Sequence, residues 1–334
     1  MTAIPEPKPY PEETLSEERV AAIRGGLLAW FEANRRDLPW RRTRDPYRIL
    51  VSEVMLQQTQ VDRVIPYYER FLELLPSVEA LADAPTSVVI TLWAGLGYNR
   101  RAVNLQRTAQ AVLERYGGVF PRDPIELRQL PGIGPYTSGA IACFAFEEPV
   151  AFLDTNMKRV IHRLIAGPDV PRQTISDRAL VSYAEQLVPI DDAWRWNQAL
   201  IEFGALQCTA RKPACVICPL QTQCVAFPSI QSVLASLPVG ARKKQEGPFA
   251  GSNRYYRGRI VDRLRAAEGG RVPLSALGPS VRDDYAEEHA EWLLKLVHDL
   301  QRDGLAQVAE TRATYSTAQN EEPLISLPET SGSN

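Results

Sequence analysis

The chain of 334 residues contains no long hydrophobic run and has few cysteines and few histidines. A membrane-spanning helix needs a run of about 18 apolar residues or more, so no transmembrane segment is predicted. Residues 1–18 are acidic and rich in proline, and they lack the basic and apolar regions of a signal peptide. We therefore expect a cytoplasmic protein with no membrane partner.

The three histidines, His162, His289 and His298, are widely separated in the sequence and do not suggest a metal site. No GxxxxGK[ST] loop is present to bind the phosphates of a nucleotide. The net charge of -2 and the pI of about 6.1 give no general attraction to nucleic acid, although a local basic patch can still bind it. Composition therefore argues against histidine-based metallohydrolases and P-loop nucleotide hydrolases.

Four of the five cysteines form the pattern C-x6-C-x2-C-x5-C: Cys208, Cys215, Cys218 and Cys224. The fifth, Cys143, lies far away in the apolar run AIACFAF. Disulfides are rare in a reducing cytosol, so the four clustered cysteines are candidate metal ligands. Four thiolates satisfy either a tetrahedral zinc ion or an iron–sulfur cluster. Zinc modules typically pair two C-x2-C units, and the single unit here, flanked by wider gaps, favours the cluster.

Helical patterns dominate the long central part of the chain and predict an all-α fold. In VNLQRTAQAVLERYGG, for example, Leu105, Ala109 and Val112 recur at helical spacing, and Gly117 supplies a left-handed stop. The segment beyond residue 253 predicts three helices and a short strand, in an order that resembles a winged helix. We expect an unstructured segment 1–18, a helical domain 19–235, a linker 236–253, a winged-helix-like domain 254–312 and a polar tail 313–334.

Three further features are candidates for binding or catalysis. In LPGIGPYTSGA, Gly132 and Gly134 permit a tight turn whose N–H groups bind a phosphate at the start of the next helix. A plain connection between two helices is the alternative for this motif. Glu53 interrupts an apolar helix, and Asp154 follows the apolar run VAFL and precedes a helix. A solvated helix residue and a helix N-cap are the alternatives for these two carboxylates.

Taken together, these motifs closely resemble the MutY family of adenine DNA glycosylases, in the helix-hairpin-helix superfamily that also includes endonuclease III. The resemblance runs in register over about residues 19–226 and implies a six-helix domain, an iron–sulfur domain with one [4Fe–4S] cluster on the four cysteines, and a monomer. The implied function is removal of adenine opposite 8-oxoguanine or guanine in double-stranded DNA, at the bacterial nucleoid. The motifs are LPWR (38–41), SEVMLQQTQV (52–61), GLGY (95–98), LPGIGPYTSGAIA (130–142), LDTNMKRV (153–160) and the four cysteines.

The resemblance also implies catalytic roles. Glu53 is the general acid that protonates the base and later helps to activate water, while Asp154 stabilises or traps the sugar cation. Tyr136 and Asn156 orient the catalytic carboxylate. Bifunctional relatives carry an attacking lysine at the position of Tyr136, so we expect a monofunctional enzyme. Because Glu53 lies in an apolar helix, we hypothesise that desolvation keeps it protonated near neutral pH.

The target base must leave the stack, so further residues are expected to contact DNA. By resemblance, Gln58 and Tyr98 lie near the opposite base, and the basic loop of the cluster domain faces the DNA backbone. On sequence grounds alone, the aromatic residues in these motifs are equally compatible with core positions. The expected DNA-binding residues are Gln57, Gln58, Tyr98, Gly132, Gly134, Arg211 and Lys212. The expected residues around the extruded base are Arg36, Trp40, Arg41 and Gln198.

The chain departs from the longer family members in its C-terminal part. No domain resembling the Nudix fold is recognisable there, so the resemblance is to short-form members, and strong discrimination for oxidised guanine is in doubt. The segment 238–265 instead carries eight cations, which would neutralise DNA phosphates or form a solvated helix face. These are Arg242, Lys243, Lys244, Arg254, Arg257, Arg259, Arg263 and Arg265.

Two other functions remain as alternatives. A thymine or uracil mismatch glycosylase of the same superfamily can also carry tyrosine in the hairpin, although Glu53 within VMLQQT favours adenine. A non-catalytic DNA sensor would use the cluster and the winged helix. The presence of Glu53, Asp154 and Tyr136 together argues against the sensor.

Overall fold

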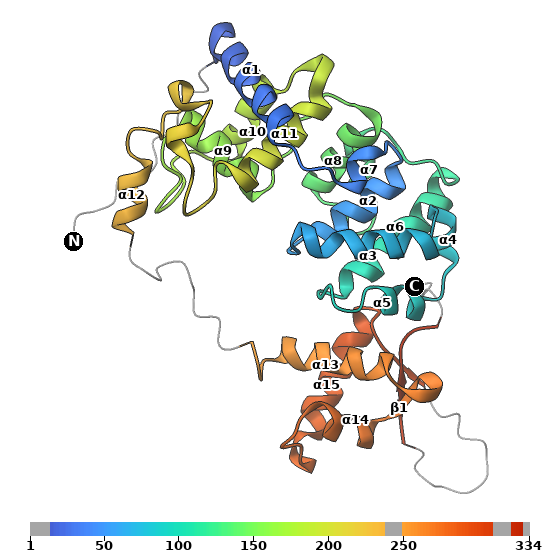
Figure 1. Ribbon diagram of the computed structural model, residues 1–334. Coiled ribbons are helices and arrows are strands. Elements are labelled where there is room, and N and C mark those ends of the chain that lie inside the picture. Colours follow the sequence, from blue (N-terminus) through green and yellow to red (C-terminus); the bar gives the residue numbers. More distant parts are fainter. Residues whose placement is uncertain (1–13, 238–248, 310–321, 330–334) are drawn as a thin grey trace, which may run out of the picture. The chain divides into compact units, whose positions relative to one another are not determined.

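The computed structural model describes residues 14–237, 249–309 and 322–329 (Figure 1). Most of the expected N-terminal segment and linker, and part of the expected tail, lie outside these residues. The described chain is mostly helical, as predicted, and includes one small sheet. It folds into two compact units rather than into domains that follow one another along the sequence. Unit 1 contains Met1–Ile49, Arg122–Arg128 and Ile133–Lys243, and unit 2 contains Leu50–Pro121, Gln129–Gly132 and Lys244–Asn334.

Unit 1 is organised around three packed helices. Helix α1 (Glu17–Asn34) packs against α11 (Ala193–Leu206), which also packs against α9 (Thr155–Ile165). The apolar stripe of α1 repeats every four residues through Ile23, Leu27 and Phe31, all fully buried, as an amphipathic helix requires. Glu17 and Glu18 are helical, although we expected them in the unstructured segment. The other elements are η1 (Pro39–Arg42), α7 (Pro124–Leu127), α8 (Pro135–Phe146), α10 (Asp177–Leu187), η2 (Ile190–Asp192), η3 (Cys215–Ile217), η4 (Gln221–Gln223) and α12 (Ile230–Ser236).

Unit 2 begins within α2 (Pro46–Leu56), the helix that carries Glu53. The predicted helix around Leu105 is confirmed as α6 (Arg100–Tyr116), and it ends where Gly117 adopts a left-handed φ of 62°. Gly117 donates its N–H to the carbonyl of Leu113 and closes the last turn. The other helices in this part are α3 (Val61–Leu74), α4 (Val78–Asp83) and α5 (Thr86–Leu92), of which α4 and α5 pack on α6.

The C-terminal part of unit 2 agrees with the winged-helix-like expectation and has two strands more than predicted. In chain order it contains α13 (Asn253–Arg265), η5 (Glu268–Gly270), β1 (Arg271–Pro273), α14 (Leu274–Val281), η6 (Glu287–His289), α15 (Ala290–Arg302), β2 (Gln307–Ala309) and β3 (Leu324–Ser326). The strands form an antiparallel sheet in the order β1-β3-β2. Residues 324–326, which we expected in a polar tail, are therefore its central strand, and Ile325 in that strand is fully buried.

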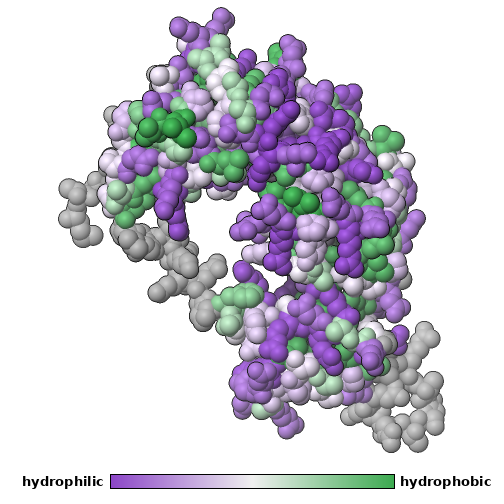
Figure 2. Space-filling model, viewed as in Figure 1, coloured by the Kyte–Doolittle hydropathy of each residue, from purple (hydrophilic) through white to green (hydrophobic). Residues whose placement is uncertain are grey.

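The core of this C-terminal part is continuous with the helices that precede it in unit 2. Ile90 on α5 and Val103 on α6 belong to the same buried cluster as Ile260, Leu296 and Ile325. The residues on the visible surface are largely hydrophilic, and hydrophobic residues form small separate patches there (Figure 2). Among the helices that the structure describes, none combines the length and apolar character needed to cross a bilayer.

Candidate active site and metal centre

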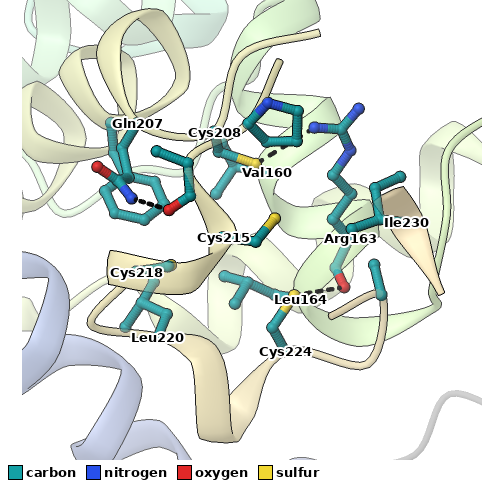
Figure 3. A pocket seen from close by; sticks show the side chains of 14 residues that line it. Val160, Arg163, Leu164, Gln207, Cys208, Cys215, Cys218, Leu220, Cys224 and Ile230 are labelled. Atoms are coloured by element: carbon teal, nitrogen blue, oxygen red, sulfur yellow. Dashed lines mark hydrogen bonds between the residues drawn. The ribbon is translucent and has the colours of Figure 1, made fainter. Parts of the chain in front are cut away.

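The four clustered cysteines surround one cavity in unit 1 (Figure 3). Cys208 follows the end of α11, Cys215 begins η3, Cys218 follows η3, and Cys224 follows η4. Tight local turns fix these positions: the N–H of Cys218 donates to the carbonyl of Cys215 at 3.2 Å, and the N–H of Cys208 donates to that of Phe203 at 2.8 Å. The rest of the cavity wall is mostly apolar and includes Val160, Leu164, Phe203, Leu220 and Ile230.

Four thiols around one mostly apolar cavity match the ligand set of an iron–sulfur cluster. Zinc bound by four thiolates needs sulfur atoms within about 3.8 Å of one another, because each Zn–S bond is about 2.3 Å. In the described residues, no three Cys, His, Asp or Glu side chains are close enough together to hold one metal ion. A [4Fe–4S] cube binds each thiolate to a different iron and so spaces the sulfurs more widely. Burial raises the pKa of the Cys218 thiol to about 11, so iron would supply the charge that stabilises its thiolate.

Arg163 on α9 ties the cysteine loop to the rest of unit 1. It is 2% exposed and donates to the carbonyls of Thr209 (2.8 Å) and Ala210 (3.1 Å). Its Nη1 lies 3.6 Å from the sulfur of Cys208, and its Nε donates to Asp169 at 2.7 Å. The loop that Arg163 holds continues into Arg211 and Lys212, which are both exposed.

Asp154 is the N-cap of α9, as the structural alternative predicted, and its side chain is also linked to the cysteine loop. One oxygen of Asp154 accepts from the N–H of Met157 at 2.7 Å, and the other accepts from Asn156 at 3.3 Å. The oxygen of Asn156 in turn accepts from buried Arg159 at 2.8 Å. Arg159 also donates to the carbonyls of Cys208 (2.9 Å) and Gly204 (2.5 Å). Asn156 is therefore hydrogen-bonded to Asp154, and its expected role in orienting the catalytic carboxylate stays a prediction.

Tyr136 lies in the first turn of α8 and packs against the segment that leads to Asp154. Its ring meets that of Phe152 edge to face, with centroids 5.4 Å apart. Gly139, one turn along α8, makes this approach possible, because a Cβ atom there would lie 2.5 Å from the Cβ of Phe152. Tyr136 and the chain from Pro149 to Leu153 line a further pocket of unit 1.

Two of the four residues expected around the base, Arg36 and Arg41, bind a carboxylate that the sequence did not reveal, and a third, Gln198, is bonded to Arg41. Glu202 on α11 is fully buried and accepts from Arg36 through both of its oxygens at 2.8 Å, and from Arg41 at 2.8 Å. Arg41 also donates to Gln198 at 2.8 Å. Burial opposes ionisation of Glu202, but these hydrogen bonds and charges hold its pKa at about 2. Trp40 is 6% exposed. The contact of Arg36, Trp40, Arg41 and Gln198 with a base stays a prediction.

Glu53 lies in unit 2 and is only 6% exposed, so it is not a solvated helix residue. The residues around it on α2, from Leu50 to Met55, are buried as well. Asp154 lies in unit 1, so the two carboxylates expected to share the reaction belong to different units.

The two residues expected near the opposite base share an unusual backbone conformation. Gln58 and Tyr98 both have left-handed φ values, 57° and 49°, and both side chains are exposed. Non-glycine residues rarely adopt this conformation. Arg101 holds both turns in place: it donates to the carbonyls of Val54 (2.8 Å) and Gln57 (2.5 Å) and to those of Leu96 and Gly97 at 3.1 Å. Its guanidinium also lies over the rings of Trp93 and Tyr98.

The hairpin glycines have different surroundings. Gly132 has a φ of 76°, and a Cβ atom there would lie 2.9 Å from Asn104, so this position favours glycine in two ways. Gly134 is the N-cap of α8 and has open space around it. Binding of a phosphate at this helix start stays a prediction.

Comparison with known proteins agrees with this arrangement. Residues 51–186 match the HhH-GPD superfamily of base excision DNA repair proteins, and residues 208–224 match the iron–sulfur binding domain of endonuclease III. The chain is 42% identical over 241 residues to an adenine DNA glycosylase of Mycolicibacterium smegmatis, which covers 72% of this chain and 79% of that one. It is 44% identical over 216 residues to the adenine DNA glycosylase of Homo sapiens, which covers 62% of this chain and 40% of that one.

Among solved structures, a thermostable thymine-DNA glycosylase is similar with a TM-score of 0.59 and 33% identity, over 63% of this chain and 97% of that one. The match to the endonuclease III domain assigns the four cysteines to a [4Fe–4S] cluster. Because a relative is this similar over most of both chains, and because both the glycosylase and cluster regions are matched, the chain belongs to the adenine DNA glycosylase family of base excision repair enzymes.

Proposed function

We propose that this protein hydrolyses the N-glycosidic bond of adenine placed opposite 8-oxoguanine or guanine in double-stranded DNA, and that it leaves an abasic site with the strand intact. The observation that carries this proposal is the geometry of Asp154. Both oxygens of its side chain accept hydrogen bonds, one from the start of α9 and one from Asn156. These hydrogen bonds fix the position of the side chain, and a carboxylate held in place is what a developing sugar cation needs.

Release of adenine also needs a proton on the leaving base. Glu53 is the proposed donor, and its burial on α2 supports this role because desolvation disfavours the charged form of a carboxyl group. In the proposed sequence, Glu53 protonates the base, the N-glycosidic bond breaks, and Asp154 stabilises the cation. Glu53, now a carboxylate, takes a proton from the water that attacks the sugar.

The monofunctional reaction follows from Tyr136. A lysine amine at this position would attack the sugar and lead to strand cleavage, and a phenol does not form the same covalent intermediate. When bound, the cluster would stabilise the start of α9. The metal site and that helix start share one set of hydrogen bonds, which runs through Arg159, Arg163 and the ligand Cys208.

The test is a single-turnover assay with excess protein and duplexes that carry A:8-oxoguanine, A:G, T:G or U:G. Each sample is divided and treated with or without alkali. We expect cleavage at adenine only after alkali, since an abasic site needs alkali to break. The ratio of the two adenine rates measures the preference for 8-oxoguanine. Strand breaks without alkali would contradict the monofunctional proposal.

Glu53→Gln tests the catalytic assignment. The amide keeps the size of the side chain but has no acidic proton to give. We therefore expect no adenine release by this variant, even over times many times longer than the single turnover of the wild-type protein. Glu69→Gln on α3, an exposed position, is the matched control and should keep the wild-type rate. Adenine release by Glu53→Gln at the wild-type rate would remove Glu53 from the mechanism.

A thymine or uracil mismatch glycosylase is the second candidate. The 33% identity to a thymine-DNA glycosylase over almost all of that chain supports it. The same assay separates the two, because cleavage confined to T:G or U:G would assign the protein to the pyrimidine branch.

A further inference from the structure

Unit 2 contains a groove whose charge suits DNA. One side is formed by the segment from Gly95 to Asn104, and the other by α13 with residues from α15 and the chain that follows it. Among the residues that the structure describes, five arginines line the groove, and the carboxylates that line it are Asp262 and Asp303. A polyanion that enters would meet an excess of positive charge.

Most of these arginines are already engaged within the protein. Arg265 donates to the carbonyl of Ile90 at 2.8 Å and to Asn99 at 2.9 Å, which attaches α13 to the segment that carries Tyr98. Arg257 donates to Asp303, and Arg100 lies 3.3 Å from the same carboxylate. These side chains shape the groove and have limited capacity for a further partner.

Arg254 differs from them. It is exposed, and within the part of the chain that the structure describes it makes no hydrogen bond and no ion pair. Its guanidinium carbon lies over two aromatic rings, 5.3 Å from the centroid of Tyr98 and 5.0 Å from the centroid of Phe249, and such cation–π contacts favour this position of the side chain. Those two rings are themselves about half exposed, at 51% and 57%.

Contacts with aromatic faces leave the five N–H donors of a guanidinium available for hydrogen bonds to another partner. A planar fork of free donors matches the oxygens of a phosphate, and arginine is used in proteins for this bidentate contact. Exposed aromatic rings beside cations are also typical of surfaces that bind nucleic acid. Arg254 is therefore held beside the two rings with N–H donors available to bind an anion.

We propose that Arg254 binds a phosphate of the DNA in this groove, so that the C-terminal part of unit 2 holds the same duplex that the glycosylase acts on. This contact lies outside both matched regions, 51–186 and 208–224. It rests on the proposed function in one respect only, namely that double-stranded DNA is the substrate. The proposal also distinguishes between cations of the basic segment 238–265. Arg254 lines the groove, whereas Arg263 is on the same helix and does not line it.

The first experiment measures the dissociation constant of a 30-base-pair A:8-oxoguanine duplex as a function of salt. Arg254→Ala, Arg254→Lys and the control Arg263→Ala are each combined with Glu53→Gln so that the duplex stays intact. We expect Arg254→Ala to weaken binding roughly tenfold and to reduce the slope of log affinity against log salt by about 1. Arg254→Lys should keep most of the slope and lose part of the affinity, because it keeps the charge without the planar fork.

Equal affinities and slopes for Arg254→Ala and Arg263→Ala would overturn the proposal. The second experiment locates the contact by replacing each phosphate of the duplex in turn with an uncharged methylphosphonate. At one position on one strand, we expect the loss caused by Arg254→Ala to disappear, because the partner of the arginine is already neutral. A loss that persists at every position would also overturn the proposal, and the position that responds tells which strand occupies the groove.

Failure of this contact and failure of the proposed function are distinguishable. Adenine release by wild-type protein is measured in a separate assay, and its outcome does not depend on whether Arg254 binds DNA. A protein that binds DNA through Arg254 and releases no base would contradict the proposed function alone.

Discussion

At the scale of single residues, Glu202 shows how unit 1 holds a charge in its interior. The side chain has no exposed surface, and two guanidinium groups compensate for the water it has lost. The pKa of about 2 lies below the ordinary value of 4.5. The contribution of Glu202 to stability is therefore fully present above pH 4.5 and is lost as the pH falls toward 2. Its size is on the order of 3 kcal/mol.

Glu202→Gln should destabilise the protein by an amount that depends on pH. Near pH 7 it leaves Arg36 and Arg41 without their carboxylate, and we expect the midpoint of thermal unfolding to fall by roughly 5–10 °C. Near pH 3 the wild-type protein has already lost part of the same interaction, so the difference should shrink. Asp37→Asn, which removes the exposed partner of Arg42, is the control and should shift the midpoint by about 2 °C at most. A difference that is equal at both pH values would contradict this account.

The sequence indicated the candidate catalytic residues and the cysteine ligands better than it indicated the residues that hold them in place. Glu53, Asp154 and the cysteines stand out because each interrupts an apolar pattern or repeats at a telling interval. Arg101, Arg159 and Arg163 each sit in ordinary charged runs, and the sequence gives no sign that they are largely buried and bound to backbone carbonyls. Those partners lie up to 49 residues away along the chain, as for Arg159 and Cys208. Local patterns do not reveal such distant contacts.

At the scale of elements, alanine substitutions at two helical glycines are expected to change stability in opposite directions. Gly139→Ala on α8 would place a methyl group 2.5 Å from the Cβ of Phe152, two positions before Asp154. We expect a loss of about 1–3 kcal/mol in stability from this overpacking, and slower adenine release. Gly25 on α1 has nothing within 4 Å of its added Cβ, so Gly25→Ala should stabilise the helix by about 0.5–1 kcal/mol.

Thermal unfolding of the two variants beside wild type checks this pair, and single-turnover rates check the effect on Asp154. The midpoints should move in opposite directions. A shift in the same direction for both would mean that helix propensity, rather than the contact with Phe152, controls position 139.

Helices were easier to predict than strands for a physical reason. A helix such as α6 repeats its apolar face over several turns, and its stop at Gly117 has a clear backbone cause. Each strand here is three residues long, which is too short to show an alternating pattern. The pairing of β1 with β3 also joins residues more than 50 positions apart, such as Val272 and Ile325. The predicted polar tail was therefore wrong for β3.

At the scale of the whole molecule, the C-terminal part of unit 2 depends for its stability on β3, a strand close to the end of the chain. β3 lies between β1 and β2, and beyond it the carbonyl of Pro328 accepts from the N–H of Ser87 at 2.8 Å. Deletion of residues 322–334 should therefore expose α13–α15 to proteases. The iron content should not change, because the cysteine ligands belong to unit 1. Deletion of residues 330–334 alone is the control.

Limited proteolysis followed by mass spectrometry measures this effect, with cuts expected between residues 249 and 309 only in the longer deletion. Identical digestion patterns for the two deletions would show that the sheet is not needed to hold the three helices.

The central place of β3 also sets an order of events during translation. Ile90 and Val103 leave the ribosome early, and the strand that completes their shared core follows more than 200 residues later. Until then, β1 and β2 have no strand between them. All four cysteine ligands are translated before β3, so the order of the chain allows iron to bind in unit 1 before the sheet of unit 2 can be completed.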